Sequence, residues 1–148
     1  MNDHTMSGNA VMFDAVVGKI LTVGGSEDYD KSWATNHTHV ITLGEPGAAS
    51  DVKPVGEVGT MHWERVFHMH VILPDGKIFI AGGRTLVVAF NEENVQFAPE
   101  LYDPETNTST ELTVNNSVRV YHTVSLLLPD GRVLTGGGGV CGTCSANH

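Results

Sequence analysis

The sequence has 148 residues, of which 41% are hydrophobic and 17% charged, so it is long enough and apolar enough to fold around a core. Its net charge is -9 with only 8 Lys and Arg residues, which argues against a nucleic-acid partner because no basic surface can neutralise a phosphate backbone. No apolar run approaches the roughly 20 residues of a membrane-spanning helix, so no membrane span is expected. The 17 glycines and the short apolar runs favour an all-β fold with frequent tight turns.

A short apolar strand that ends in a glycine doublet occurs three times. The copies are residues 19–25, 77–83 and 132–139. Leu-Pro-Asp-Gly precedes two of them, at 73–76 and 128–131, and predicts hairpin turns because Pro presets φ and Gly supplies a positive φ. The strands before these turns, 71–73 and 125–128, are apolar on both faces and are predicted to be buried between neighbouring sheets.

The repeat extends upstream of the hairpins. Arg-Val-Phe-His at 65–68 parallels Arg-Val-Tyr-His at 119–122. The spacing of about 55 residues is close to the kelch period of roughly 50, which predicts about four strands and one propeller blade per repeat. Residues 1–148 then form one partial kelch β-propeller domain of about three blades, a fragment of a longer protein, because closed propellers usually have about four to eight blades. A β-sandwich with chance repeats is the alternative.

Tyr121 and His122 stand at the entry to a buried strand of the last repeat. Adjacent strand residues point to opposite faces, so both can reach one metal ion only if the backbone turns there. Imidazole and phenolate together suit Cu(II), and the alternative is a core tyrosine beside a hydrogen-bonded histidine. His68 has the same setting but follows Phe67, which indicates that the scaffold repeats while the chemistry occurs in one copy.

Other histidines alternate along predicted strands. His37 and His39 form one pair, and His62, His68 and His70 form a second group. Histidines two residues apart on a strand share a face and can hold a metal ion, although such residues are more often polar strand positions.

Cys141 and Cys144 lie in a glycine-rich loop after the last predicted strand. A local disulfide, a redox motif and half of a zinc site are the options. A structural disulfide is favoured because the sequence has no second Cys pair and no βαβ pattern, and it would require an oxidising compartment. Sequons at Asn36, Asn107 and Asn115 also favour a secreted, extracellular protein.

Taken together, these residues resemble the galactose oxidase family of copper radical oxidases. The similarity runs from about Gly8 to His148, and the segments that carry it are 8–15, 19–22, 41–47, 118–122, 126–133 and 136–148. The resemblance implies a secreted enzyme on a seven-bladed kelch propeller, which oxidises a primary alcohol of a sugar or related molecule to an aldehyde and reduces O₂ to H₂O₂. It also implies one copper ion, bound by two tyrosines and two histidines, and a radical on a thioether-linked Cys–Tyr pair.

Carried onto this sequence, the resemblance makes Tyr121 the axial tyrosine that takes the alcohol proton and His122 a copper ligand. It makes Cys141 and Cys144 a family disulfide. The cross-linked Cys–Tyr pair and the second histidine of the family fall outside this sequence. The chain alone is therefore expected to lack the radical cofactor and to be inactive, with the remaining blades possible on another chain.

Two further positions concern the substrate. Phe90 falls where the family places a phenylalanine beside the substrate, and Asp30 stands where the family carries a substrate-contacting glutamine. The 84–94 loop also differs from the family, so the identity of the alcohol stays open. The alternative to an oxidase is a non-catalytic kelch module that binds a glycan or a protein.

Overall fold

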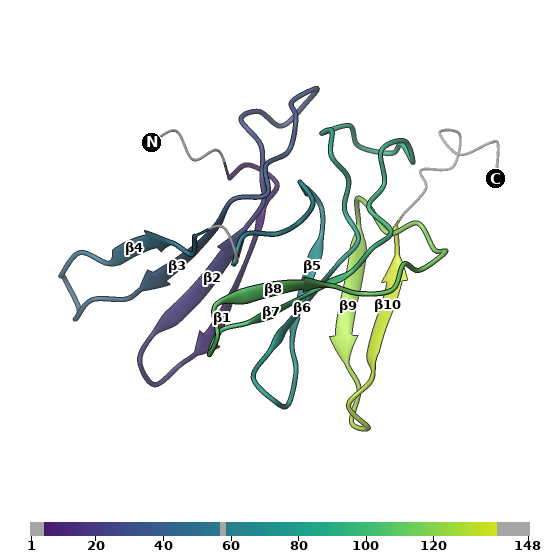
Figure 1. Ribbon diagram of the computed structural model, residues 1–148. Coiled ribbons are helices and arrows are strands. Elements are labelled where there is room, and N and C mark those ends of the chain that lie inside the picture. The colour runs from purple at the N-terminus through teal and green to yellow at the C-terminus, as the bar shows by residue number, and fades with distance from the viewer. Residues whose placement is uncertain (1–4, 57–58, 139–148) are drawn as a thin grey trace.

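The computed structural model describes residues 5–56 and 59–138, which form antiparallel sheets and, in that part of the chain, no helix (Figure 1). The all-β prediction is therefore confirmed. The first sheet contains β1 (Asn9–Asp14), β2 (Lys19–Val23), β3 (Thr38–Thr42) and β4 (Asp51–Pro54). The second contains β5 (Met69–Ile72), β6 (Ile78–Ala81), β7 (Glu100–Asp103) and β8 (Thr108–Glu111). β9 (Thr123–Leu127) pairs with β10 (Val133–Gly137).

Both predicted hairpin turns are present. The amide of Leu73 donates to the carbonyl of Lys77 at 2.8 Å, and the amide of Leu128 donates to that of Arg132 at 2.7 Å. Gly76 and Gly131 have φ values of 85° and 84°, the left-handed conformation that glycine adopts without steric cost. The shared Leu-Pro-Asp-Gly sequence thus produces the same turn between β5 and β6 as between β9 and β10.

The glycine doublets join each sheet to the next. The amide of Gly25, after β2, donates to the carbonyl of Arg65 at 2.9 Å, and the amide of Gly83, after β6, donates to that of Arg119 at 2.7 Å. The two arginines begin the repeated Arg-Val-aromatic-His segments. Both motifs therefore recur at the same kind of place, a backbone contact between successive sheets.

Replacing Gly24 with Ala is expected to destabilise the fold more than replacing Gly76 with Ala. Both glycines have a positive φ, but a Cβ at Gly24 would collide with the Arg65 carbonyl oxygen and lie 2.9 Å from the His68 ring, whereas a Cβ at Gly76 meets nothing within 4 Å. Gly76→Ala is expected to cost about 1 kcal/mol for its conformation alone. Urea unfolding of the two variants measures the difference, and equal losses would contradict the close approach.

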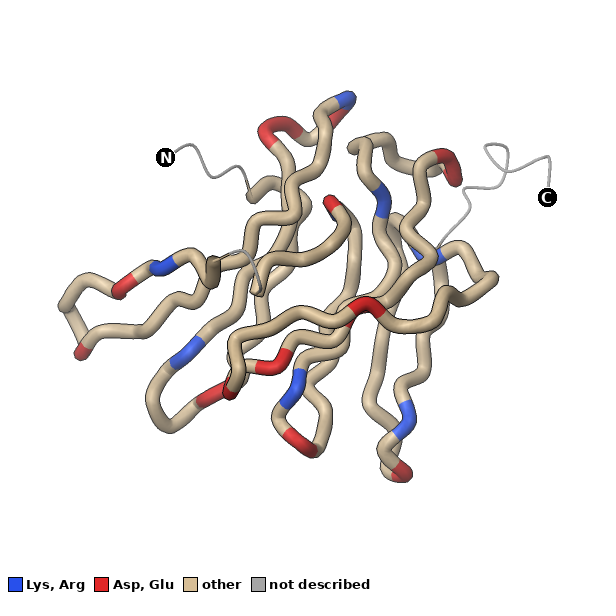
Figure 2. Tube along the Cα trace, in the orientation of Figure 1, with Lys and Arg blue, Asp and Glu red and all other residues tan. Residues whose placement is uncertain are grey.

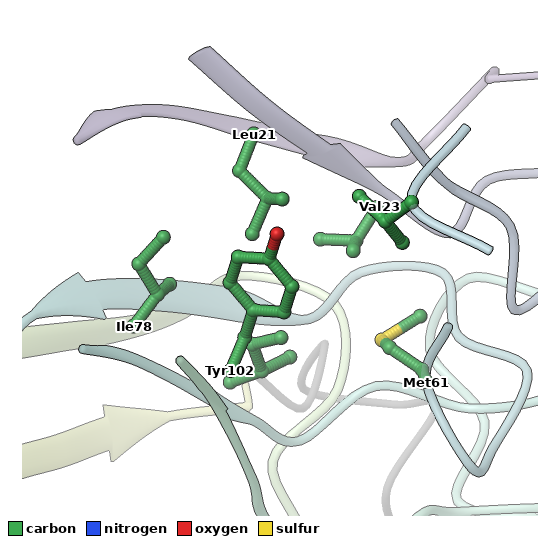
Figure 3. Packing of buried hydrophobic residues seen from close by; sticks show 7 residues of the cluster. Leu21, Val23, Met61, Ile78 and Tyr102 are labelled. Atoms are coloured by element: carbon green, nitrogen blue, oxygen red, sulfur yellow. The ribbon is translucent and has the colours of Figure 1, made fainter. Parts of the chain in front are cut away.

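The main apolar core lies between the first two sheets (Figure 3). Leu21 and Val23 of β2 face Ile78 of β6 and Tyr102 of β7, with Met61 closing one side. Each fully buried aliphatic side chain contributes about 1.5–3 kcal/mol. This core fixes the positions of the loops that follow β2 and β6.

A buried ion pair lies beside this core. Arg65 and Glu100 are both 0% exposed, and Nη2 of Arg65 donates to Oε1 of Glu100 at 2.9 Å. Glu100 also accepts from the backbone amide of His62 at 2.7 Å and from Oγ of Ser109 at 3.0 Å. Burial raises the pKa of the Glu100 carboxyl, but the His62 amide, the Arg65 charge and their hydrogen bonds outweigh it and hold the pKa below its ordinary value. His62 thus belongs to this network rather than to the group with His68 and His70.

The predicted burial of residues 125–128 is wrong for two of its members. Leu126 and Leu127 are 57% and 41% exposed, while Val71 of β5, at the matching place in the other hairpin, is buried. The reason is that β9 pairs with β10 and packs against β5, and nothing in the described chain covers the opposite side of the hairpin.

Lys and Arg positions are scattered singly along the Cα trace, and several loop tips carry acidic residues (Figure 2). The described residues include no helix of the length and apolarity that a membrane crossing requires.

Candidate metal centre

Two long connections meet at one end of the sheets. The 24–37 segment follows β2 and the 82–99 segment follows β6, and both rise at the same end (Figure 1). The amide of Lys31 donates to the Val87 carbonyl at 2.7 Å, and that of Ala34 donates to the Thr85 carbonyl at 2.8 Å. Residues far apart in the sequence are thereby brought to the segment that leads into β9.

Tyr121 and His122 lie together at this end. Their rings stack, with centroids 3.9 Å apart and an interplanar angle of 29°. His122 has a φ of 63°, so the chain turns there instead of continuing as a strand that would send the two side chains to opposite faces. The backbone turn required for a shared metal ion is present.

Two phenylalanines form an aromatic wall around Tyr121. Phe67 and Phe90 each contact its ring edge-to-face with centroids 5.1 Å apart, and Phe90 lies 5.7 Å from the His122 ring. Phe67 and Phe90 have φ values of 59° and 55°, a conformation that costs bulky residues about 1–3 kcal/mol each. Three left-handed residues, counting His122, thus gather around one tyrosine, and such outliers cluster at functional sites.

Tyr29 is a member of this site that the sequence reasoning missed. Its hydroxyl oxygen lies 3.1 Å from that of Tyr121, across 92 positions of sequence. The hydrogen bond to Tyr121 raises the pKa of Tyr29, with smaller effects from burial and from the Tyr121 charge, and either hydroxyl can be the donor. The neighbouring Asp30, which the sequence singled out, forms an exposed ion pair with Lys31 at 4.0 Å.

Tyr29, Phe67, Tyr121 and His122 line a cavity of about 370 Å³, whereas Phe90 and Asp30 are not among its lining residues. It is lined by Ser7, Gly8, Asn9, Tyr29, Phe67, His68, Met69, Tyr121, His122 and Thr123. Among the described residues no three His, Cys, Asp or Glu side chains gather as a metal site. Tyr121 and His122 therefore offer an oxygen and a nitrogen donor, the donor types that suit Cu(II), as part of a ligand set.

Arg84 holds the loop that carries Phe90, and it too was missed by the sequence reasoning. The side chain is 1% exposed, and its Nη1 donates to the carbonyls of Val88 and Asn91, each at 2.6 Å. Its backbone also pairs with Val66 in both directions. A buried guanidinium that closes a loop in this way fixes where Phe90 stands.

Replacing Arg84 with Met is expected to loosen this loop, because the half-buried carbonyls of Val88 and Asn91 lose their donor while the aliphatic stem is kept. Limited proteolysis within residues 88–94 should become about 10-fold faster, which corresponds to about 1.4 kcal/mol of lost local stability. Arg132→Met is the matched control, since Arg132 is exposed and pairs with Asp130 in a hairpin turn. Equal protection of the loop in both variants would contradict the role of Arg84.

The two copies of the Arg-Val-aromatic-His segment differ in their turn. The left-handed residue is Phe67 in one copy and His122, one position later, in the other. As a result His68 is 1% exposed, whereas His122 is exposed, so the expectation of one setting for both histidines is wrong. His68 forms a close pair with His70, at 5.0 Å between ring centroids, and the His37 and His39 rings are 6.5 Å apart. Cys141 and Cys144 lie outside the described residues.

Comparison with known families gives a match over most of the chain. Residues 6–143 match the family described as "Glyoxal oxidase N-terminus". A galactose oxidase of Gibberella zeae is 52% identical over 143 residues, which is 97% of this chain and 21% of that protein. An aldehyde oxidase of Arabidopsis thaliana, GLOX1, is 39% identical over 93 residues, 60% of this chain and 15% of that protein.

A solved structure shares the fold. It is described as a novel fungal alcohol oxidase with catalytic diversity among the AA5 family, in complex with copper, and it superposes with a TM-score of 0.88 at 40% identity. The match covers 93% of this chain and 28% of that structure. This chain therefore spans about a fifth of the curated galactose oxidase and just over a quarter of the solved alcohol oxidase.

Proposed function

Because the chain belongs to the glyoxal oxidase N-terminus family, we propose that it is part of a galactose oxidase-like copper radical oxidase. The complete enzyme would oxidise a primary alcohol, of galactose or a related sugar or alcohol, to an aldehyde while O₂ is reduced to H₂O₂. The observation that carries this proposal is the stacked Tyr121–His122 pair, which opens on one cavity together with Tyr29.

The proposed architecture is part of a seven-bladed kelch-type propeller. The β1–β4 and β5–β8 sheets would each be one blade, and β9–β10 would be the inner strands of a third. Support comes from the identical strand order of the two complete sheets and from the glycine-to-arginine hydrogen bond that links each sheet to the next. The exposed apolar side chains of β9 also fit a strand that a further blade would cover.

Tyr121 and His122 would hold the copper ion, and Tyr121 would accept the proton of the bound alcohol. When bound, copper supplies a Lewis acid, a one-electron acceptor and a template for alcohol and phenolate. Once Tyr121 is a phenolate, Tyr29 would donate its hydroxyl proton to the Tyr121 oxygen and stabilise that form. Phe67 and Phe90 hold the Tyr121 ring in place, and Phe90 also contacts His122. Phe90, on the 84–94 loop, and Asp30 would contact the substrate.

Copper binding to the full chain tests this proposal. The wild type is expected to give one Cu(II) electron paramagnetic resonance signal with nitrogen hyperfine structure and a visible phenolate-to-copper band. His122→Ala should lose the signal, and His62→Gln should keep it, because His62 contacts Glu100 instead of the cavity. Wild type that binds Cu(II) no better than His122→Ala would refute the metal centre.

The isolated chain is also expected to release no peroxide with primary alcohols, because the thioether-linked tyrosine of the family is not assigned to any of its residues. Peroxide release by the purified chain at the rate of a complete oxidase would show that this part of the proposal is wrong.

We also propose that the protein is secreted. The three sequons are then expected to differ in whether they are glycosylated. The side-chain amides of Asn36 and Asn107 donate to the carbonyls of Met61 and Val55. In Asn115 only the side-chain oxygen is engaged, by the amide of Ser117 at 2.9 Å. Folded chain secreted by a yeast host is expected to carry its glycan at Asn115 alone, as checked by peptide mass spectrometry. Full occupancy at Asn36 or Asn107 would contradict this.

A further inference from the structure

His68 and His70 form a buried imidazole pair apart from the Tyr121–His122 donors. His68 immediately precedes β5, and His70 is the second residue of that strand. Their ring centroids are 5.0 Å apart with an angle of 49° between planes. None of the four ring nitrogens has a hydrogen-bond partner within the described chain, and all four are shielded from solvent.

Four buried ring nitrogens without a partner destabilise the fold unless a ligand binds them. More than about 90% of buried polar groups in proteins have a partner, and each one without a partner costs about 1–3 kcal/mol. The side chain of His68 is also held firmly. A Cβ at Gly24 would lie 2.9 Å from its Cε1, and one at Gly83 would lie 3.0 Å from its Cβ, so glycines of two doublets enclose it. The donors are thus preorganised rather than free to turn toward water.

Both imidazoles are in the form that binds metals. Burial lowers the pKa of His70 to about 3, with a smaller effect from the Arg65 charge. Burial, the His70 charge and the Arg65 charge together lower the pKa of His68 well below its ordinary value. The Val23 carbonyl opposes them only weakly, since it lies near the His68 ring without completing a hydrogen bond to it. Neutral imidazoles with available lone pairs are the protonation state that metal ligation requires.

The charged groups around His68 and His70 favour a monovalent ion over a dication. The pair has no carboxylate partner, since the described residues contain no group of three His, Cys, Asp or Glu side chains, and Glu100 is engaged by Arg65. The positive charge of Arg65 acts on both rings. Born solvation energy rises with the square of the charge, so a dication would be penalised about four times as strongly as a monovalent ion in such a site.

We propose that His68 and His70 bind one Cu(I) ion. This monovalent ion has a filled d shell and can be held by two nitrogen donors. At 5.0 Å between the ring centroids, N–metal bonds of about 2 Å reach one nitrogen of each ring in a bent arrangement. His68 also lines the cavity next to Tyr121 and His122, which gives the ion a way in from solvent. The site does not depend on the proposed oxidase function, because it uses neither Tyr121 nor His122.

Anaerobic competition between the full chain and the chromophoric chelator bicinchoninate tests this site. The wild type and His122→Ala are each expected to retain one Cu(I) ion, and His70→Ser is expected to retain it at least 10-fold more weakly. His39→Ser is the matched control, because His39 belongs to the other alternating pair, whose rings are edge-to-face and farther apart. X-ray absorption of the loaded wild type should show two nitrogen ligands.

Thermal unfolding distinguishes a loss of Cu(I) binding in His70→Ser from a failure of that variant to fold. Cu(I) should raise the melting temperature of the wild type and of His39→Ser but not of His70→Ser, whose far-ultraviolet circular dichroism checks its fold. No retention of Cu(I) by the wild type, equal loss in the His39→Ser control, or tighter binding of Zn(II) than of Cu(I) would each overturn the assignment. Loss in His122→Ala with retention in His70→Ser would assign the ion to the Tyr121 site instead.

Discussion

Replacing Glu100 with Gln is expected to lower the free energy of unfolding of the chain by about 3–5 kcal/mol. The substitution leaves the Arg65 guanidinium fully buried without its counter-charge, and it weakens the acceptor of the His62 amide and the Ser109 hydroxyl. Urea unfolding followed by circular dichroism measures the loss. Asp75→Asn removes a carboxylate from an exposed pair with Lys77 and should cost no more than about 1 kcal/mol. Similar losses in the two variants would contradict a structural role for the buried pair.

The same pair predicts how stability depends on pH. The pKa of Glu100 is lower in the folded chain than its ordinary value of about 4.3, so the unfolded state takes up a proton first. The stabilisation is complete above that ordinary value and is lost as pH falls through the folded pKa. Wild type should therefore lose stability more steeply than Glu100→Gln below about pH 4. Replacing Arg65 and Glu100 together by Met and Leu should recover much of the loss at neutral pH.

Replacing Tyr121 with Phe is expected to lower the Cu(II) affinity of the chain by more than 100-fold and to abolish the visible phenolate band. This substitution removes one of two described donors, whereas loss of a hydrogen-bonding neighbour of a ligand typically costs about 10–100-fold. Tyr29→Phe, which removes only such a neighbour, should fall in that smaller range and shift the band without removing it. Competitive titration and absorption spectra give both quantities.

Tyr102→Phe is the control for the two tyrosine variants. The Tyr102 hydroxyl donates to Asn107 at 2.7 Å within the core, so its loss should affect stability and leave Cu(II) affinity unchanged. If Tyr121→Phe and Tyr102→Phe bound Cu(II) equally well, the phenolic oxygen of Tyr121 would not be a ligand.

The parts of the fold that were predictable from sequence are those with local causes. Leu-Pro-Asp-Gly and the glycine doublets predict turns and strand ends because proline and glycine restrict the backbone within a few residues. The burial of β9 was not predictable in this way, because Leu126 and Leu127 are apolar whether or not another layer covers them. Packing of that kind depends on which elements are present on both sides of a strand.

The candidate site was predictable only in part for a related reason. A Tyr-His pair suggests a metal, but the left-handed backbone that brings the two rings together is uncommon for any residue other than glycine, and the composition does not reveal it. Tyr29 and Arg84 act through contacts to Tyr121 and to the Phe90 loop, which only the folded chain creates. The resemblance to the family points to Asp30 by its position in the sequence, whereas the contact of Tyr29 with Tyr121 exists only in the folded chain.

The amide-to-carbonyl bonds from Gly25 to Arg65 and from Gly83 to Arg119 have a consequence for how the molecule can change. Each sheet supplies the donor for a bond whose acceptor lies in the lead-in to the next sheet. An insertion that lengthens a hairpin turn leaves these bonds intact, whereas a deletion that shifts a lead-in segment by one residue removes an acceptor from the preceding sheet. The fold therefore tolerates the gain or loss of whole repeats better than the insertion or deletion of single residues where one sheet joins the next.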